Sequence, residues 1–124
     1  MMRRALAVLT LVVCAAALAG CGDDDSSGSG DGKDLAKKTI QVTIEGDDVT
    51  PNGDRVEVKT GQPIELVVQA DAAGEIHVHS DPEKELEYAA GTTTLPTFTI
   101  DKPGIVEVES HALEKTIVQL EVKK

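Results

Sequence analysis

The three histidines are the side chains of this chain best suited to binding a metal ion. His77 and His79 are one residue apart in the stretch EIHVHS at positions 75–80, and His111 follows later in the chain. Neutral imidazole nitrogen is a good ligand for Cu(II) and Zn(II). We therefore expect any chemical site to lie around these residues.

The stretch that carries His77 and His79 is predicted to be a β-strand, because apolar and polar residues alternate in it. Side chains two positions apart in a strand lie on the same face, so the two imidazoles should point to one side, opposite Ile76 and Val78. Since Ile76 and Val78 are expected to face the core, the imidazoles should face solvent or the mouth of the fold. If the strand end at His111 lies beside this strand, the three imidazoles predict a copper or zinc site.

Carboxylates near the histidines leave two interpretations open. Asp81 or Glu114 could add an oxygen ligand to a bound ion. Histidines on half-exposed strands are also commonly paired with carboxylates without any metal, and Glu83, Glu85 and Glu87 have the pattern of a solvated face. Metal binding and metal-free, solvent-facing histidines are both hypotheses at this point.

From Thr39 onward, short segments of alternating polarity are separated by turn residues such as glycine, proline and aspartate. The expected strands cover residues 39–45, 55–60, 64–70, 75–80, 93–101, 105–110 and 116–122. Residues 47–54 are expected to form a turn, and residues 83–88 could be a helical turn or an edge strand. Seven or eight short strands without a convincing helix predict a single all-β domain over residues 39–124, an antiparallel sandwich or small barrel.

Residues 1–20 have the features of a signal peptide, because Arg3 and Arg4 precede an apolar run that ends in small residues. The stretch LAGC at positions 18–21 resembles the lipobox of bacterial lipoproteins. This resemblance implies cleavage before Cys21, lipidation of its sulfur, and retention on the extracytoplasmic face of the cell membrane. An ordinary secreted protein with a chance cysteine is the alternative.

Residues 21–38 are expected to be the lipidated cysteine followed by a flexible acidic tether, rich in glycine, serine and aspartate. Such a segment has too little apolar surface to offset the entropy of ordering the chain. A calcium loop is a weaker alternative, because the spacing lacks the distal glutamate of an EF-hand loop.

The charge and the cysteine count exclude several classes of function. The chain has a net charge of −10 at pH 7, and loss of Arg3 and Arg4 would make it more acidic. This balance argues against a nucleic-acid partner and against binding to anionic lipid without an acyl anchor. The only cysteines are Cys14 and Cys21, so the domain at 39–124 has no disulfide, no thiol nucleophile and no thiolate ligand.

Two further motifs carry a resemblance to a known family. Gly61-Gln62-Pro63 precedes an apolar strand, and Pro103-Gly104 opens a valine-alternating strand after the histidine strand. This arrangement resembles the cupredoxin fold, and is most similar to the cupredoxin-like domains of bacterial lipoproteins and of EfeO-type iron-uptake proteins. The resemblance implies a Greek-key β-sandwich with a metal site at one end.

The same resemblance does not extend to the blue-copper ligands. The type 1 copper centre of that family needs a histidine, then a cysteine, a second histidine and usually a methionine. His77 or His79 matches the first histidine, but Ser110 lies near the cysteine position, and His111 directly follows it instead of standing further on. Leu113 or Lys115 occupies the place of the methionine. The expectation is therefore the fold without type 1 electron transfer.

A different family offers an enzymatic alternative. His77, His79, Glu83, Gly91 and the later His111 are partly similar to the cupin metal motif, which implies a small metalloenzyme. The second cupin motif, Pro-x-Gly-x-x-His, is absent.

The sequence thus predicts a membrane-anchored, extracytoplasmic, non-catalytic domain that binds copper or zinc through His77, His79 and His111. A metal-free module that binds another envelope protein is the alternative.

Overall fold

The structure is a computed structural model that describes residues 34–124, which form β-strands and no helix. The expected signal peptide, the lipidation site Cys21 and most of the expected tether lie outside the described residues. Within the described residues, no helix is long and apolar enough to cross a membrane. The strands are β1 (Lys38–Glu45), β2 (Asp48–Thr50), β3 (Asp54–Lys59), β4 (Ile64–Ala70), β5 (Gly74–Val78), β6 (Lys84–Tyr88), β7 (Gly91–Thr94), β8 (Gly104–Ser110) and β9 (Lys115–Lys123).

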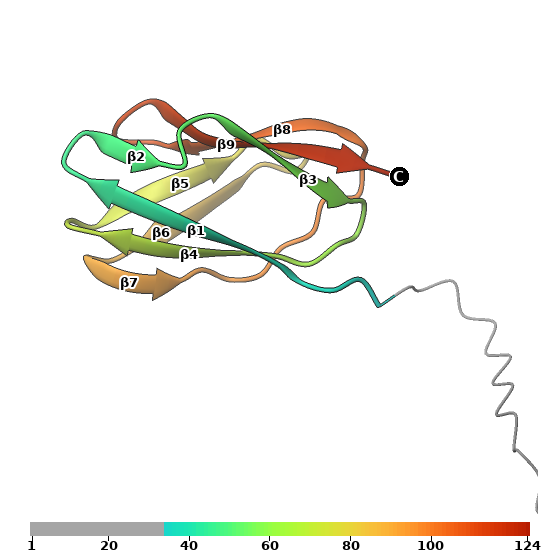
Figure 1. Cartoon of the computed structure of the whole chain (residues 1–124), viewed down its shortest axis with the longest axis horizontal. Helices are drawn as coiled ribbons and strands as arrows, with labels where there is room; N and C mark the ends of the chain where they lie inside the picture. The colour runs from blue at the N-terminus through green and yellow to red at the C-terminus, as the bar shows by residue number, and fades with distance from the viewer. Residues whose placement is uncertain (1–33) are drawn as a thin grey trace, which may run out of the picture. The chain divides into compact units, whose positions relative to one another are not determined.

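The strands form two sheets that pack face to face, as Figure 1 shows. One sheet has the order β2-β1-β4-β7 and the other has the order β3-β9-β8-β5-β6. The predicted all-β sandwich is confirmed, but the sheets are mixed, because β1 pairs with β4 and β3 pairs with β9 in parallel. A parallel pair needs a crossover connection, and β3 supplies it by lying in the opposite sheet between β1 and β4 in the chain.

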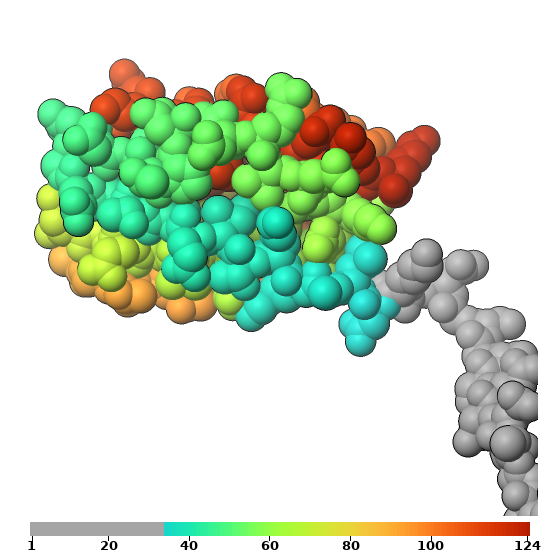
Figure 2. All heavy atoms as spheres, viewed as in Figure 1, coloured from blue at the N-terminus to red at the C-terminus, as the bar shows by residue number. Residues whose placement is uncertain are grey.

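The core lies between the sheets and is almost entirely aliphatic. Apolar residues alternate along each strand, so that one face of β4 buries Ile64, Leu66 and Val68 completely. Tyr88 and Phe98, the only aromatic residues of the chain, are also buried. In the space-filling view, side chains fill the space that the ribbons leave open (Figure 2). Because no disulfide is available, this packing is the main source of stability.

Most strands agree with the alternation in the sequence, and the predicted strand 64–70 has the bounds of β4. In the segment 83–88, for which two interpretations were open, Lys84–Tyr88 form the edge strand β6. The segment 47–54 was expected to be only a turn, but it contains the short strand β2, in which Val49 pairs with Ile44.

The expected strand 93–101 is wrong as a single element. Residues 91–94 form β7 against β4, and Phe98 then makes an isolated bridge with Ile64. Pro96 lies between these two pairings. A proline has no backbone N–H for the ladder and interrupts a strand, which accounts for the break.

The last residues of the expected tether contact the domain. The Lys38 N–H donates to the Pro63 carbonyl at 2.8 Å, and the Gln62 side chain donates to the Ala36 carbonyl at 2.8 Å. Lys37 forms an ion pair with Glu65. Residues 36–38 therefore already contact the domain, and β1 begins at Lys38.

Candidate metal centre

β5 positions His77 on the outer face of the five-stranded sheet. Ile76 and Val78 have no exposed surface, so the alternate residue His77 points away from the core, as the alternation predicted. β5 lies between β6 and β8, and its antiparallel register places Glu85 and Glu109 directly opposite His77. The imidazole of His77 therefore lies in a row between two carboxylate-bearing residues.

His79 lies just after the end of β5, but it remains attached to the sheet. Its backbone N–H donates to the Glu107 carbonyl on β8 at 2.9 Å. Its ring nitrogens face two carboxylates: Nε2 is 2.6 Å from Glu109 Oε2 and Nδ1 is 3.3 Å from Glu83 Oε1. The side chain is 40% exposed, so an ion could reach it from solvent.

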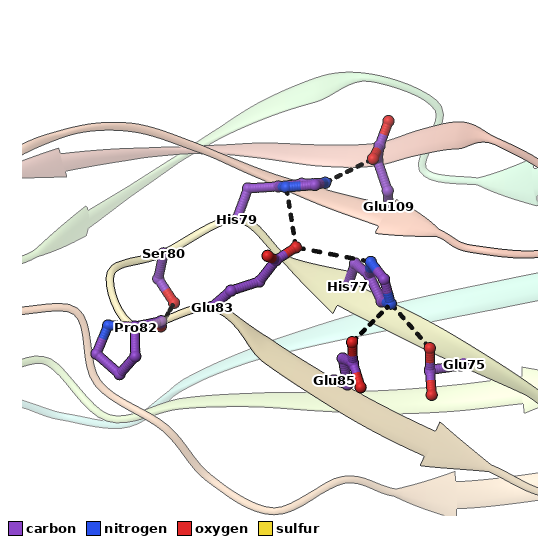
Figure 3. A network of polar contacts seen from close by, with 8 residues as sticks. All are labelled: Glu75, His77, His79, Ser80, Pro82, Glu83, Glu85 and Glu109. Carbon is purple, nitrogen blue, oxygen red and sulfur yellow. Dashed lines mark hydrogen bonds and ion pairs between the residues drawn. The ribbon is translucent and has the colours of Figure 1, made fainter.

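His77 is more enclosed and also has carboxylates at both ring nitrogens. Its Nε2 is 2.8 Å from Glu75 Oε1 and 3.6 Å from Glu85 Oε1. Its Nδ1 is 3.7 Å from Glu83 Oε1. In Figure 3, Glu83 lies between the two imidazoles, with Glu75 and Glu85 at the other edge of His77.

His111, which follows β8, lies beside the histidine strand, the condition on which the predicted three-histidine set depended. Its N–H donates to the Glu75 carbonyl at 3.0 Å. The ring centroids of His77 and His111 are 4.4 Å apart, whereas those of His77 and His79 are 6.1 Å apart. His77 is thus next to both of the other histidines.

The candidate ligands fall into two groups, whose ligand atoms lie within 4.8 Å of one another. One group is Glu75, His77 and His111, and the other is His77, His79 and Glu83. Over residues 34–124, no such group contains His79 and His111 together. Each group therefore offers two imidazoles and one carboxylate, a donor set suited to Cu(II) or Zn(II).

The carboxylates in these groups differ from the two that were named as oxygen ligands. Asp81 instead pairs with Lys102, whose ammonium group lowers the pKa of that carboxyl through a hydrogen bond. Glu114 lies in the turn after β8 and belongs to neither group. Glu75 could have been found from the sequence, because it shares the strand face of His77 by the same two-residue spacing. Glu83 was named as part of an acidic, solvated face and, as a ligand, only through the similarity to the cupin motif.

The contacts of His77 and His79 create an electrostatic conflict that a cation would relieve. A neutral imidazole has one N–H donor and one lone pair, whereas a carboxylate only accepts hydrogen bonds. Because both nitrogens of each ring face carboxylate oxygens, one ring lone pair would point at an oxygen lone pair. A second proton on the ring or a metal ion beside it removes this repulsion.

An open pocket of about 480 Å³ adjoins the first group, and its lining includes Glu75, His111 and Tyr88. Burial raises the pKa of the Tyr88 hydroxyl, while the nearby Ser110 hydroxyl opposes this shift. Gly74 lies across from Tyr88, and a Cβ at this position would be 2.3 Å from the Tyr88 oxygen. The missing side chain of Gly74 therefore lets the phenol lie against β5.

Comparison with solved structures identifies the fold of this chain. No family model and no curated protein matches this chain. Auracyanin A, a blue copper protein from Chloroflexus aurantiacus, matches 71% of this chain and all of its own chain with a TM-score of 0.54 and 13% identity. A reduced auracyanin from Roseiflexus castenholzii matches 70% of this chain and 98% of its own with a TM-score of 0.50 and 15% identity. The fold is cupredoxin-like.

A third cupredoxin-like match is part of a larger protein. A multi-copper oxidase from Pediococcus acidilactici matches 73% of this chain with a TM-score of 0.53 and 15% identity. The match covers 26% of the oxidase, so this chain corresponds to about a quarter of that protein. Identities at this level describe the fold alone.

The residues of this cupredoxin-like domain do not fit a type 1 copper ion. Ser110, near the expected cysteine position, is fully buried on the core side of β8. Its Oγ has no hydrogen-bond partner within the described chain. The Tyr88 hydroxyl lies nearby, but the two hydroxyls do not have the geometry of a hydrogen bond. Every cysteine and methionine of the chain precedes residue 34, so the domain has neither the thiolate nor the thioether of such a centre.

The cupin-like set is also only partly assembled. Glu83 does lie beside His77 and His79. Gly91, however, begins β7 in the opposite, four-stranded sheet, so the glycine of that motif is not near the histidines.

Proposed function

We propose that this cupredoxin-like domain binds a divalent cation, Cu(II) or Zn(II), through imidazole and carboxylate ligands centred on His77. The observation that carries the proposal is that His77 and His79 have carboxylate oxygens at both ring nitrogens. Such a surface attracts a cation. We propose no catalytic activity and no type 1 electron transfer.

Copper is the stronger candidate of the two metals. For nitrogen and oxygen donors, affinity rises along the first transition series to Cu(II) and falls again at Zn(II). One structural neighbour is named a blue copper protein, which supports copper as a metal for this fold although the ligands differ. Zinc has no strong geometric preference, so it would also accept these ligands.

The test is a metal titration of the purified chain and of its His77→Ala variant. We expect the wild-type chain to bind CuCl₂ or ZnCl₂ with a dissociation constant tighter than about 1 μM, equivalent to roughly −8.2 kcal/mol. The variant should lose most of this affinity. A matched control is Glu57→Gln, because Glu57 is exposed on β3 and pairs with Lys123, away from the histidines. Equal affinities for the wild type and His77→Ala would contradict the proposal.

We further propose that the chain is a lipoprotein, with residues 1–20 removed and Cys21 acylated on the extracytoplasmic face of the cell membrane. The signal-peptide features and the LAGC stretch support this proposal. The motifs Gly61-Gln62-Pro63 and Pro103-Gly104 support kinship with the cupredoxin-like domains of bacterial lipoproteins and EfeO-type proteins. Membrane fractions of cells fed labelled palmitate should contain the labelled protein, and Cys21→Ser should abolish both the label and the membrane association.

A metal-free module that binds another envelope protein is a second candidate. It is favoured by the short contacts that each imidazole already makes, such as 2.6 Å between His79 Nε2 and Glu109 Oε2. In that case, His77 and His79 would hold the acidic surface together through their contacts with Glu75 and Glu109. Cross-linking on intact cells would then capture a partner equally well in the presence and absence of a metal chelator.

A further inference from the structure

The ring of His77 serves two different groups of ligands with its two nitrogens. Its Nε2 faces Glu75 at 2.8 Å, and its Nδ1 faces Glu83 at 3.7 Å. Glu75 belongs to the group with His111, and Glu83 belongs to the group with His79. His77 is the only member common to the two groups.

One ion cannot use both groups. The lone pairs of an imidazole lie in the ring plane and point away from different edges of the ring, so a single ion reaches only one of the two nitrogens. We infer that the site takes two divalent cations, one on each nitrogen of His77. Glu75 and His111 complete one position, and His79 and Glu83 complete the other. This inference rests on the proposed function and adds the number of ions and the carboxylate ligands.

The local charge also requires more than one divalent ion for neutrality. Glu75, Glu83, Glu85 and Glu109 each lie within 4.0 Å of an imidazole nitrogen of His77 or His79. In the described part of the chain, none of these four carboxylates forms an ion pair with lysine or arginine. Two divalent cations offset four of the five negative charges that are present once His77 bridges them as an imidazolate, whereas one ion on a neutral His77 leaves half of the carboxylate charge uncompensated.

Binding of two ions by the one imidazole of His77 releases one proton. A neutral imidazole that binds one ion through its lone pair still carries a proton on the other nitrogen. Binding of the second ion releases that proton to solvent and leaves an imidazolate bridge, with no change in oxidation state. Metal–nitrogen distances are about 2 Å, so ligand atoms now within 4.8 Å of one another reach an ion by small side-chain rotations.

The experiment measures the number of ions bound per chain in the wild type and in variants of the full chain, and compares these numbers. Each variant is equilibrated with excess ZnCl₂, freed of unbound metal, checked for folding by circular dichroism and analysed by elemental analysis. His77→Ala should hold two fewer ions than the wild type, whereas His79→Ala and His111→Ala should each hold one fewer. Because the histidine variants differ only at the histidine site, any zinc bound elsewhere on the chain cancels in the difference. Glu57→Gln should keep the wild-type number.

Loading with CuCl₂ gives an independent measurement. Two Cu(II) ions bridged by one ring are magnetically coupled, so the wild type should show a weaker electron paramagnetic resonance signal per copper than His79→Ala or His111→Ala. A loss of only one ion in His77→Ala, together with a full uncoupled copper signal in the wild type, would overturn the two-ion site while leaving the proposed function intact. No histidine-dependent binding at all would remove both.

Discussion

At the scale of residues, the site is defined by oxygen and nitrogen where a type 1 copper site needs sulfur. The residue nearest the expected cysteine position, Ser110, points into the core and has no hydrogen-bond partner in the described chain. The imidazole of His77 instead points outward, to carboxylates on its own strand and on β6. The end of β8 therefore carries a buried serine where a type 1 centre needs a thiolate.

The carboxylate of Glu83 should contribute directly to metal affinity. Its Oε1 lies 3.7 Å from His77 Nδ1 and 3.3 Å from His79 Nδ1. Glu83→Gln keeps the size of the side chain but removes its negative charge. We expect affinity at this position to fall at least about 10-fold, or about 1.4 kcal/mol, in a titration by calorimetry. Unchanged affinity in Glu83→Gln would assign this carboxylate to the solvated surface.

The hydroxyl of Tyr88 should make the domain less stable at alkaline pH. Burial raises its pKa in the folded protein, whereas the unfolded chain loses this proton near pH 10. The folded state therefore holds the proton more tightly, and the stability that this provides below pH 10 is lost as pH rises through the folded pKa. Tyr88 is the only tyrosine, so absorbance at 295 nm reports its titration alone.

The matched measurement is chemical unfolding of the wild type and of Tyr88→Phe between pH 8 and pH 12. The stability of the wild type should fall more steeply with pH above about 10 than that of the variant. A Tyr88 midpoint at or below the value of a free tyrosine would show that the hydroxyl is hydrated in the folded protein.

At the scale of strands, the sequence predicts where most of the strands lie, but it does not predict which strands pair with each other. The period of two along β5 was enough to place His77 opposite Ile76 and Val78, because the faces of a strand alternate strictly. It could not show that Glu109 lies beside His77, since that depends on the register of β5 with β8. The strand β2, of three residues, is too short to show any period.

The grouping of the three histidines differs from the one that the sequence predicted. It treated all three as a single set, because spacing along the chain does not give the direction of each ring. The structure places the ring of His111 beside His77 with the two planes tilted by 31°, whereas the ring of His79 is T-shaped to His77 at 72°. This division follows from His111 bonding to the backbone of Glu75, a contact between strands distant in sequence.

The pairing of β5 with β6 depends on the absence of a side chain at Gly74. This residue does not have a positive φ, so alanine would be acceptable to the backbone. Its Cβ would, however, lie 2.3 Å from the hydroxyl oxygen and 2.7 Å from Cζ of the buried Tyr88 ring. We expect Gly74→Ala to lower the free energy of unfolding by about 1–3 kcal/mol, the usual cost of overpacking.

A double-mutant cycle identifies the cause of that loss. In the background of Tyr88→Leu, which removes the crowded ring, Gly74→Ala should cost clearly less than in the wild type. Urea unfolding of the four proteins supplies the measurement. Equal costs in the two backgrounds would mean that the glycine is needed for another reason.

At the scale of the whole molecule, the aliphatic core and the acidic site have opposite effects on the stability of the fold. The core packs without any disulfide, whereas carboxylates gather around His77 and His79 on one sheet face of a chain whose net charge is −10. Like charges held close together in the folded state repel more strongly than in an open chain. The folded domain without metal therefore carries a strain that bound cations would relieve.

Metal binding should consequently raise the thermal stability of the folded domain. A ligand that binds only the folded state adds about 2.7 kcal/mol at a concentration 100 times its dissociation constant. For a domain of this size, each kcal/mol raises Tm by about 4–8 °C, so ZnCl₂ should raise Tm by roughly 10–20 °C. His77→Ala should abolish this shift, because it removes the residue shared by both ligand groups. Calorimetric melting with and without a chelator measures the effect, and an equal rise in the variant would place the stabilising ion elsewhere on the acidic surface.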